Sequence, residues 1–170
     1  LQGLLVLEAA AMQESGAGYE ETIARIKEIR SSGRIFFTVG NMEYLKAGGR
    51  IGKVAGAAGA LLGIKPIITL KEGEIFPSGI GRVRKKTMLK TIDLLLAYLH
   101  ERAANISRYS IAVGYGYDMA EAQEYRALVL ERLRGEYGEV ALPVYQIGAT
   151  IGVHTGPYPI GLGIVEKALL

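Results

Sequence analysis

Tyr109-Ser-Ile-Ala-Val-Gly-Tyr115 and, shortly after it, Asp118-Met-Ala-Glu121 decide the fold class of this 170-residue chain. The first segment is rich in β-branched and aromatic residues, which predicts a strand. Asp118 and Glu121 have the spacing of a capping box, with Asp in place of Ser or Thr, and predict the start of a helix. That helix carries its apolar residues on one side: Ala122, Tyr125, Leu128, Val129 and Leu133.

The same alternation of strands and helices extends in both directions along the chain. Helices are expected over residues 1–13, buried on most faces, then around Ile23 to Ile29, briefly from Asn41, and over residues 85–100. Strands are expected at residues 35–39, 66–70, 75–76, 140–147 and 162–165, with a hairpin turn at 71–74. The pattern predicts an α+β (α/β layered) domain, in which helices pack on one mixed β-sheet.

Composition excludes several classes of function. The net charge is only +3 and the cations alternate with acids, which argues against nucleic acid as a partner. There is no cysteine, which excludes disulfides and thiolate chemistry, and two histidines are too few for a dedicated metal site. The longest run of apolar residues and glycine, 54–64, is too short to cross a bilayer, so stable membrane insertion is not expected. The absence of cysteine fits a cytoplasmic protein.

Glycine is unusually frequent and is clustered. The 23 glycines are nearly twice the share expected from an average of about 7%, and they gather at 48–63, 79–81 and 148–163. Such clusters indicate close backbone approach, tight turns or a ligand lying against the main chain. The segment 51–62 is predicted to be a helix of alanine and glycine that another helix or an extended ligand can approach.

Three segments are candidates for binding. Lys46–Lys53 is a cationic glycine-rich turn before a helix. It either binds an anion or is only a helix boundary with solvated cations, and it lacks the Gly-Lys-Ser/Thr ending of a P-loop. Gly81–Lys86 places cations at a helix start, where they oppose the helix dipole, and suits either solvated charges or an anionic partner. Gly152–Pro157 is a predicted loop in which His154 is either structural or part of a site. No arrangement of residues indicates catalysis.

Five strings of residues, taken in order, resemble the DegV family of fatty-acid-binding proteins. They are Gly-Leu-Leu-Val-Leu-Glu-Ala-Ala from Gly3, Glu-Tyr-Leu-Lys-Ala-Gly-Gly-Arg-Ile-Gly-Lys from Glu43, Ile-Lys-Pro-Ile from Ile64, Gly-Arg-Val-Arg from Gly81, and Ile-Gly-Val-His-Thr-Gly-Pro from Ile151. The resemblance implies a protein of two domains that holds one long-chain fatty acid, such as palmitate or oleate, and needs no other cofactor. Residues 1–14 would be the terminal helix of a mostly absent N-terminal domain, and residues 15–170 the C-terminal lipid-binding domain.

The resemblance also implies a partner and a set of site residues. Some DegV proteins present their fatty acid to a separate fatty acid kinase, which phosphorylates the carboxyl group, so the chain is expected to be a lipid-binding subunit and not an enzyme. His154 and Thr155 match the family's His-Thr-Gly-Pro loop. Arg84 matches its Gly-Lys-Val-Arg segment and would meet the head group or the kinase. Arg82 and Tyr158 stand where lysine and glycine are usual. The candidate apolar walls are Ala58, Leu61, Leu62, Ile64 and Ile67.

Two other functions remain open from the residues. One is an enzyme, a small-molecule phosphotransferase or hydrolase that uses the glycine-rich loops and His154. The other is a plain interaction module. Burial of an acyl chain favours the lipid reading, because each buried methylene contributes roughly 0.8 kcal/mol and the chain offers a long segment with little side-chain obstruction.

Overall fold

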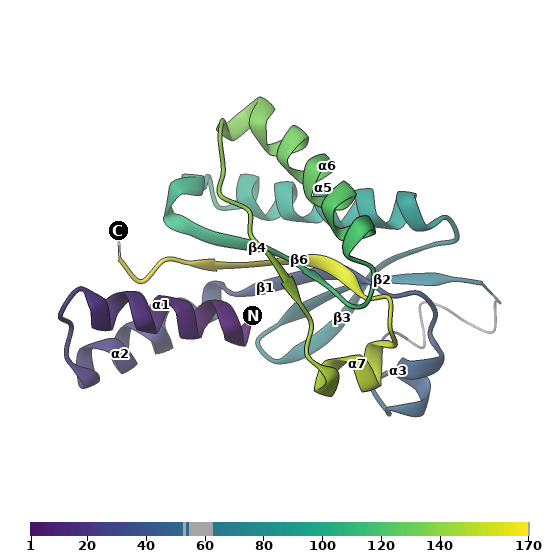
Figure 1. Cartoon of the computed structure of the whole chain (residues 1–170), viewed down its shortest axis with the longest axis horizontal. Helices are drawn as coiled ribbons and strands as arrows, with labels where there is room; N and C mark the ends of the chain where they lie inside the picture. The colour runs from purple at the N-terminus through teal and green to yellow at the C-terminus, as the bar shows by residue number, and fades with distance from the viewer. Residues whose placement is uncertain (53, 55–62, 170) are drawn as a thin grey trace.

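The computed structural model describes residues 1–52, 54 and 63–169, and shows one mixed β-sheet with helices on both faces (Figure 1). The described α-helices are α1 (Gln2–Glu14), α2 (Tyr19–Ile29), α3 (Glu43–Ala47), α5 (Arg84–Glu101), α6 (Met119–Tyr137) and α7 (Ala149–Thr155). The strands are β1 (Arg34–Thr38), β2 (Lys65–Lys71), β3 (Glu74–Gly81), β4 (Tyr109–Tyr115), β5 (Val144–Gln146) and β6 (Ile160–Glu166). Short 3₁₀ turns lie at Arg30–Ser32 and Ile106–Arg108.

The six strands lie in the order β3-β2-β1-β6-β4-β5. All neighbouring pairs are antiparallel except β4 and β5, which are parallel and are joined through α6. The hairpin between β2 and β3 turns at Glu72 and Gly73, whose φ angles of 52° and 83° are those of a tight two-residue turn. The predicted α+β fold with a mixed sheet is therefore confirmed.

One face of the sheet is covered by α5 and α6 (Figure 1). Residues Phe36, Leu162 and Val113 lie opposite one another on three adjacent strands and belong to the same buried cluster as the apolar sides of both helices. The two helices run in the same direction, because ion pairs join them at successive positions. These pairs are Arg84–Glu121, Asp93–Arg132 and His100–Glu136.

The other face is covered in two parts. One part is packed by α1 and α2, with Leu4, Met12 and Ile29 against Ala112 and Val165 of the sheet. The other part is packed by α3 and residues near it, with Leu45, Val39 and Val54 against Ile68. Among the described residues, no helix has both the length and the apolar character needed to span a bilayer.

The structure corrects three expectations. The helix at the N-terminus is buried on one side only, because Val6 and Leu7 are exposed while Leu4 and Met12 face the sheet. The strand expected at 140–147 is reduced to Val144–Gln146, since only these residues pair with β4. Residues 149–155 form the helix α7 and not a loop; glycines there mark its ends at Gly148 and Gly156. Most of the predicted helix 51–62 lies outside the described residues.

Glu8 joins α1 to the sheet and to the end of the chain. Its carboxylate is buried, with 8% of the residue exposed, and accepts hydrogen bonds from Ser110 Oγ at 2.6 Å and from Ala168 N at 2.8 Å. Nearby, Arg25 of α2 donates to the carbonyls of Lys167 and Ala168 at 3.0 and 3.1 Å. Two helices from the start of the chain thus hold the segment that follows the last strand.

We predict that Glu8→Ala lowers the free energy of unfolding by about 2 kcal/mol, because it leaves the buried amide of Ala168 and the partly buried hydroxyl of Ser110 without their acceptor. Urea unfolding followed by circular dichroism measures the effect. Glu14→Ala is the matched control, since Glu14 is exposed on the same helix and is expected to change stability little. Equal stabilities for the two variants would contradict the anchoring role of Glu8.

Candidate functional site

Two of the three segments singled out in the sequence meet in the structure. The turn that follows α3 and the segment that contains His154 lie side by side, on the sheet face opposite α5 and α6 (Figure 1). The third segment, Gly81–Lys86, starts α5 and lies on the other face. The site candidate is therefore the contact between α3 and α7.

Three glycines allow the two segments to touch. A Cβ added to Gly48 would lie 2.2 Å from His154 Nδ1, and one added to Gly156 would lie 2.5 Å from the ring of Tyr44. A Cβ on Gly40 would lie 3.3 Å from Cβ of Tyr158, which is tight but not prohibitive. Gly40 contacts Tyr158, and Gly48, later in the chain, contacts His154, which precedes Tyr158. The two segments therefore run antiparallel. We call this contact the glycine seam, formed by Gly40, Gly48 and Gly156.

His154 occupies the last turn of α7 and is half-buried. Its Nδ1 atom is buried and has no hydrogen-bond partner among the residues that the structure describes. Thr155 is buried, and its hydroxyl donates to the carbonyl oxygen of Ile151 at 3.1 Å. Gly156 ends the helix with a φ of 74°, a conformation that glycine adopts without strain. The Thr155 hydroxyl is thus already hydrogen-bonded within α7, whereas the imidazole of His154 is not.

Apolar side chains around α7 are exposed. Ile151 and Val153 of α7 are 53% and 66% exposed, and Tyr158 follows at 47%. Tyr158 makes an edge-to-face contact with Tyr117, with ring centroids 6.5 Å apart. A polar imidazole beside exposed apolar side chains suits a ligand that has one polar end and an apolar body.

Arg84 lies away from this contact. Its guanidinium binds Glu121 through two hydrogen bonds, Nε to Oε1 at 2.8 Å and Nη2 to Oε2 at 2.7 Å. Both side chains are mostly buried, with 21% and 24% exposed. The remaining nitrogen Nη1 is buried and has no hydrogen-bond partner within the described ranges. Glu121 therefore closes only half of the predicted capping box: its amide donates to Asp118, while its carboxylate is held by Arg84.

The Arg84–Glu121 pair borders a buried hydroxyl pair. Thr91 and Tyr125 share a hydrogen bond of 2.5 Å between α5 and α6, and burial raises the pKa of the Tyr125 phenol. The phenol therefore stays protonated in the folded protein. This part of the molecule is a polar joint between two helices.

The predicted apolar walls are placed as follows. Ile67 is fully buried and lies opposite Thr38, which also pairs with Ile160, so by alternation its side chain faces α5 and not α7. Ile64 is buried just before β2. Ala58, Leu61 and Leu62 lie outside the described residues. The sheet thus separates Ile67 and Arg84 from His154 and Thr155.

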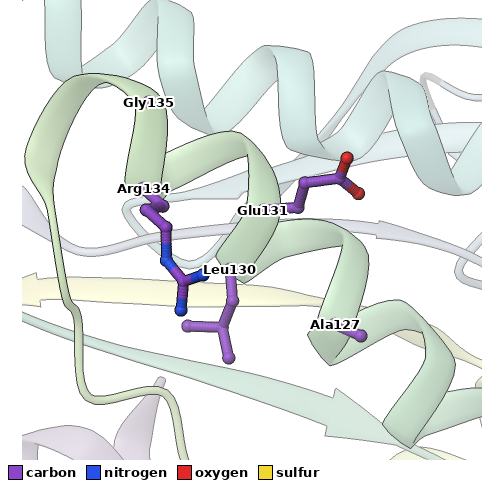
Figure 2. A pocket seen from close by; sticks show the side chains of 5 residues that line it. All are labelled: Ala127, Leu130, Glu131, Arg134 and Gly135. Atoms are coloured by element: carbon purple, nitrogen blue, oxygen red, sulfur yellow. The ribbon is translucent and has the colours of Figure 1, made fainter.

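Two hollows lie on the layer of α5 and α6. One, of about 500 Å³, runs along α6, where Leu130 and Arg134 point to one side and Glu131 to the other, so its side chains do not converge (Figure 2). The second, of about 480 Å³, is an open groove between α5 and α6 that includes Arg84 and Glu121. Within the described ranges, no group of three or more His, Asp or Glu residues is arranged to hold a metal ion.

Sequence reasoning missed two functional neighbours. Gly48 contacts the imidazole of His154, although 105 residues lie between them in the sequence. The density of glycines near position 48 was the only sequence signal of a close contact there. Glu121 is the partner of Arg84, and its place in a capping box concealed that role.

The family model described as "Uncharacterised protein, DegV family" matches residues 1–167. A DegV domain-containing protein of Clostridium perfringens is 36% identical over 166 residues, which are 97% of this chain and 56% of that protein. The chain thus spans little more than half the length of this relative.

Solved structures give the same result. A protein from Eubacterium ventriosum, described as fatty acid (stearic acid)-binding, is 42% identical with a TM-score of 0.86, over 98% of this chain and 56% of its own. A DegV family protein from Thermus thermophilus, described by its fatty acid binding, is 29% identical with a TM-score of 0.78. The match covers 96% of this chain and 56% of the Thermus protein. The agreement in sequence and in fold leads to one conclusion: this chain belongs to the DegV family.

Proposed function

We propose that this chain binds one long-chain fatty acid, such as palmitate or oleate, and presents its carboxyl group to a separate fatty acid kinase. The observation that carries the proposal is the half-buried His154 beside the exposed apolar side chains of α7. Related DegV proteins from Eubacterium ventriosum and Thermus thermophilus are described as binding fatty acids, which supports the same ligand class here. His154 would hydrogen-bond the carboxylate, which needs a donor when it leaves water.

The acyl chain would lie in an apolar tunnel completed by a second domain. We propose that Ile64, Ala58, Leu61 and Leu62 belong to its walls, and that Thr155 supports the head-group end. Residues 15–170 would form the lipid-binding domain and residues 1–14 the last helix of the other domain; here that helix packs against the sheet. Residue Ile67, which faces α5, would act by supporting the wall from behind.

The protein would act without catalysis of its own, in the cytoplasm. We propose that the kinase supplies ATP and the phosphoryl-transfer machinery, while this chain supplies the shielded lipid. Supporting this division, the hydroxyl of Thr155 beside His154 donates to the carbonyl oxygen of Ile151, and among the described residues no hydroxyl is hydrogen-bonded to His154 Nδ1. The enzyme alternative has no observation in its favour.

Arg84 would serve the kinase and not the head group. Its guanidinium is held by Glu121, and the sheet lies between it and α7, which supports the docking role. The exposed cations around it on the first turn of α5, Lys85 and Lys86, would add to a positive surface for a partner. A kinase that reaches both places must extend around the edge of the sheet.

We predict that native mass spectrometry of the full-length protein, followed by denaturing extraction, detects one fatty acid of 14 to 18 carbons. His154→Ala should weaken binding about 10- to 100-fold, because a hydrogen bond to a charged group is worth roughly 1.5–3 kcal/mol. His100→Ala is the control, since His100 is exposed and pairs with Glu136. A protein that is empty and takes up no added oleate would refute the lipid proposal.

We predict that Arg84→Gln combined with Glu121→Gln keeps the bound fatty acid but lowers its phosphorylation by the kinase about tenfold, because a contact worth roughly 1.4 kcal/mol is lost. Acyl phosphate formation from ATP measures the effect. The control is Asp93→Asn with Arg132→Gln, an exposed ion pair between the same two helices at 2.7 Å. Loss of the fatty acid itself would instead assign Arg84 to the head group.

A further inference from the structure

We infer that Gly48 holds the imidazole of His154 in the neutral tautomer that carries its proton on Nε2. Gly48 is then a positioning residue, and His154 offers a ligand one donor of fixed direction. The use of that donor for a fatty acid carboxylate rests on the proposed function. The tautomer itself rests on the contact between the two residues and on the burial of Nδ1.

The geometry of the contact favours an acceptor at Nδ1. The position that a Cβ of Gly48 would take lies 2.2 Å from Nδ1 and 3.2 Å from Cε1. Glycine carries a hydrogen in that direction, so a C–H bond of Gly48 points at Nδ1. A lone pair on Nδ1 accepts this weak interaction, whereas an N–H there would place two hydrogens against each other.

Burial acts in the same direction. Nδ1 is removed from water, and no polar group of the described part of the chain takes the place of the water. A proton on Nδ1 would make it a buried donor without an acceptor, which is among the rarest arrangements in folded proteins. A neutral imidazole has one N–H, so the proton belongs on Nε2, the nitrogen that is not buried against Gly48.

The arrangement selects the chemistry of the head group. A carboxylate accepts from Nε2–H, but a protonated long-chain amine has only donors and gains no hydrogen bond from it. The site should therefore prefer a fatty acid over the amine of equal chain length by at least about tenfold, although both have the same apolar body.

Nitrogen-15 NMR of the full-length protein labelled on histidine tests the tautomer directly. The signals of His154 are identified by their disappearance in His154→Gln. We expect one protonated nitrogen, coupled through the ring as Nε2, and one unprotonated nitrogen, Nδ1. A proton found on Nδ1 of the neutral ring would overturn the inference.

Gly48→Ala tests the positioning role. The backbone at Gly48 has φ −80° and ψ 2°, which alanine adopts without strain. The added Cβ would lie 2.2 Å from Nδ1 of His154 and 3.1 Å from the carbonyl oxygen of Tyr44, so its main effect is to displace the ring. We expect loss of the single-tautomer signature and a fatty acid affinity reduced at least about tenfold. Gly135→Ala is the matched control, because Gly135 lies in α6, away from the glycine seam, with no atom within 4 Å of the added Cβ, and it should change neither.

The outcomes separate the two proposals. If Gly48→Ala keeps the wild-type spectrum and affinity while circular dichroism shows a folded protein, the inference is wrong. If the wild type shows the Nε2–H tautomer and Gly48→Ala removes it, but no fatty acid binds to the wild type, the inference about the ring stands and the proposed function fails.

Discussion

Strand β6 enters the middle of the sheet, between β1 and β4, although it is the last strand of the chain. Leu162 pairs with Phe36 on one side and with Val113 on the other, and joins them in the main core. Gly161 admits β1 closely, since a Cβ there would lie 2.2 Å from the carbonyl oxygen of Phe36. Neither half of the sheet is complete without this strand, which makes its insertion the constraint on the rest of the fold.

The position of the candidate site follows from that pairing. The strands β1 and β6 are antiparallel, and Thr38 at the end of β1 lies opposite Ile160 at the start of β6. The element that follows β1 and the element that precedes β6 must therefore lie at the same end of the sheet. These elements are α3 and α7. Pairing of the strands brings the two helices together, and the glycine seam then sets how closely they approach.

Sequence reasoning reached the fold because the core strands and helices each carry their own local pattern. The strand at 109–115 and the cap at Asp118 are read from adjacent residues, and both are present as expected. The candidate site was harder to predict from the sequence. Contacts such as Gly48 with His154 join residues that are distant in the chain, and no local pattern encodes them. The glycines around α7 indicated a loop because their role is to end a short helix and to permit contact, and packing against α3 overrides their low helix propensity.

The two candidate binding regions lie on opposite faces of one sheet, and this restricts how a partner can use them. Under the proposed function, a kinase that phosphorylates a carboxylate at His154 would have to reach the α7 face, whereas the cations at the start of α5 lie beyond the sheet. The connection between them runs along the edge strand β3, which ends at Gly81 immediately before α5. A single partner that senses both regions must therefore contact that edge. The hairpin of β2 and β3 lies between α3 and α5 in the sequence, and its two strands are hydrogen-bonded to each other. It therefore connects the face that carries the turn at Gly48 with the face that carries the first turn of α5.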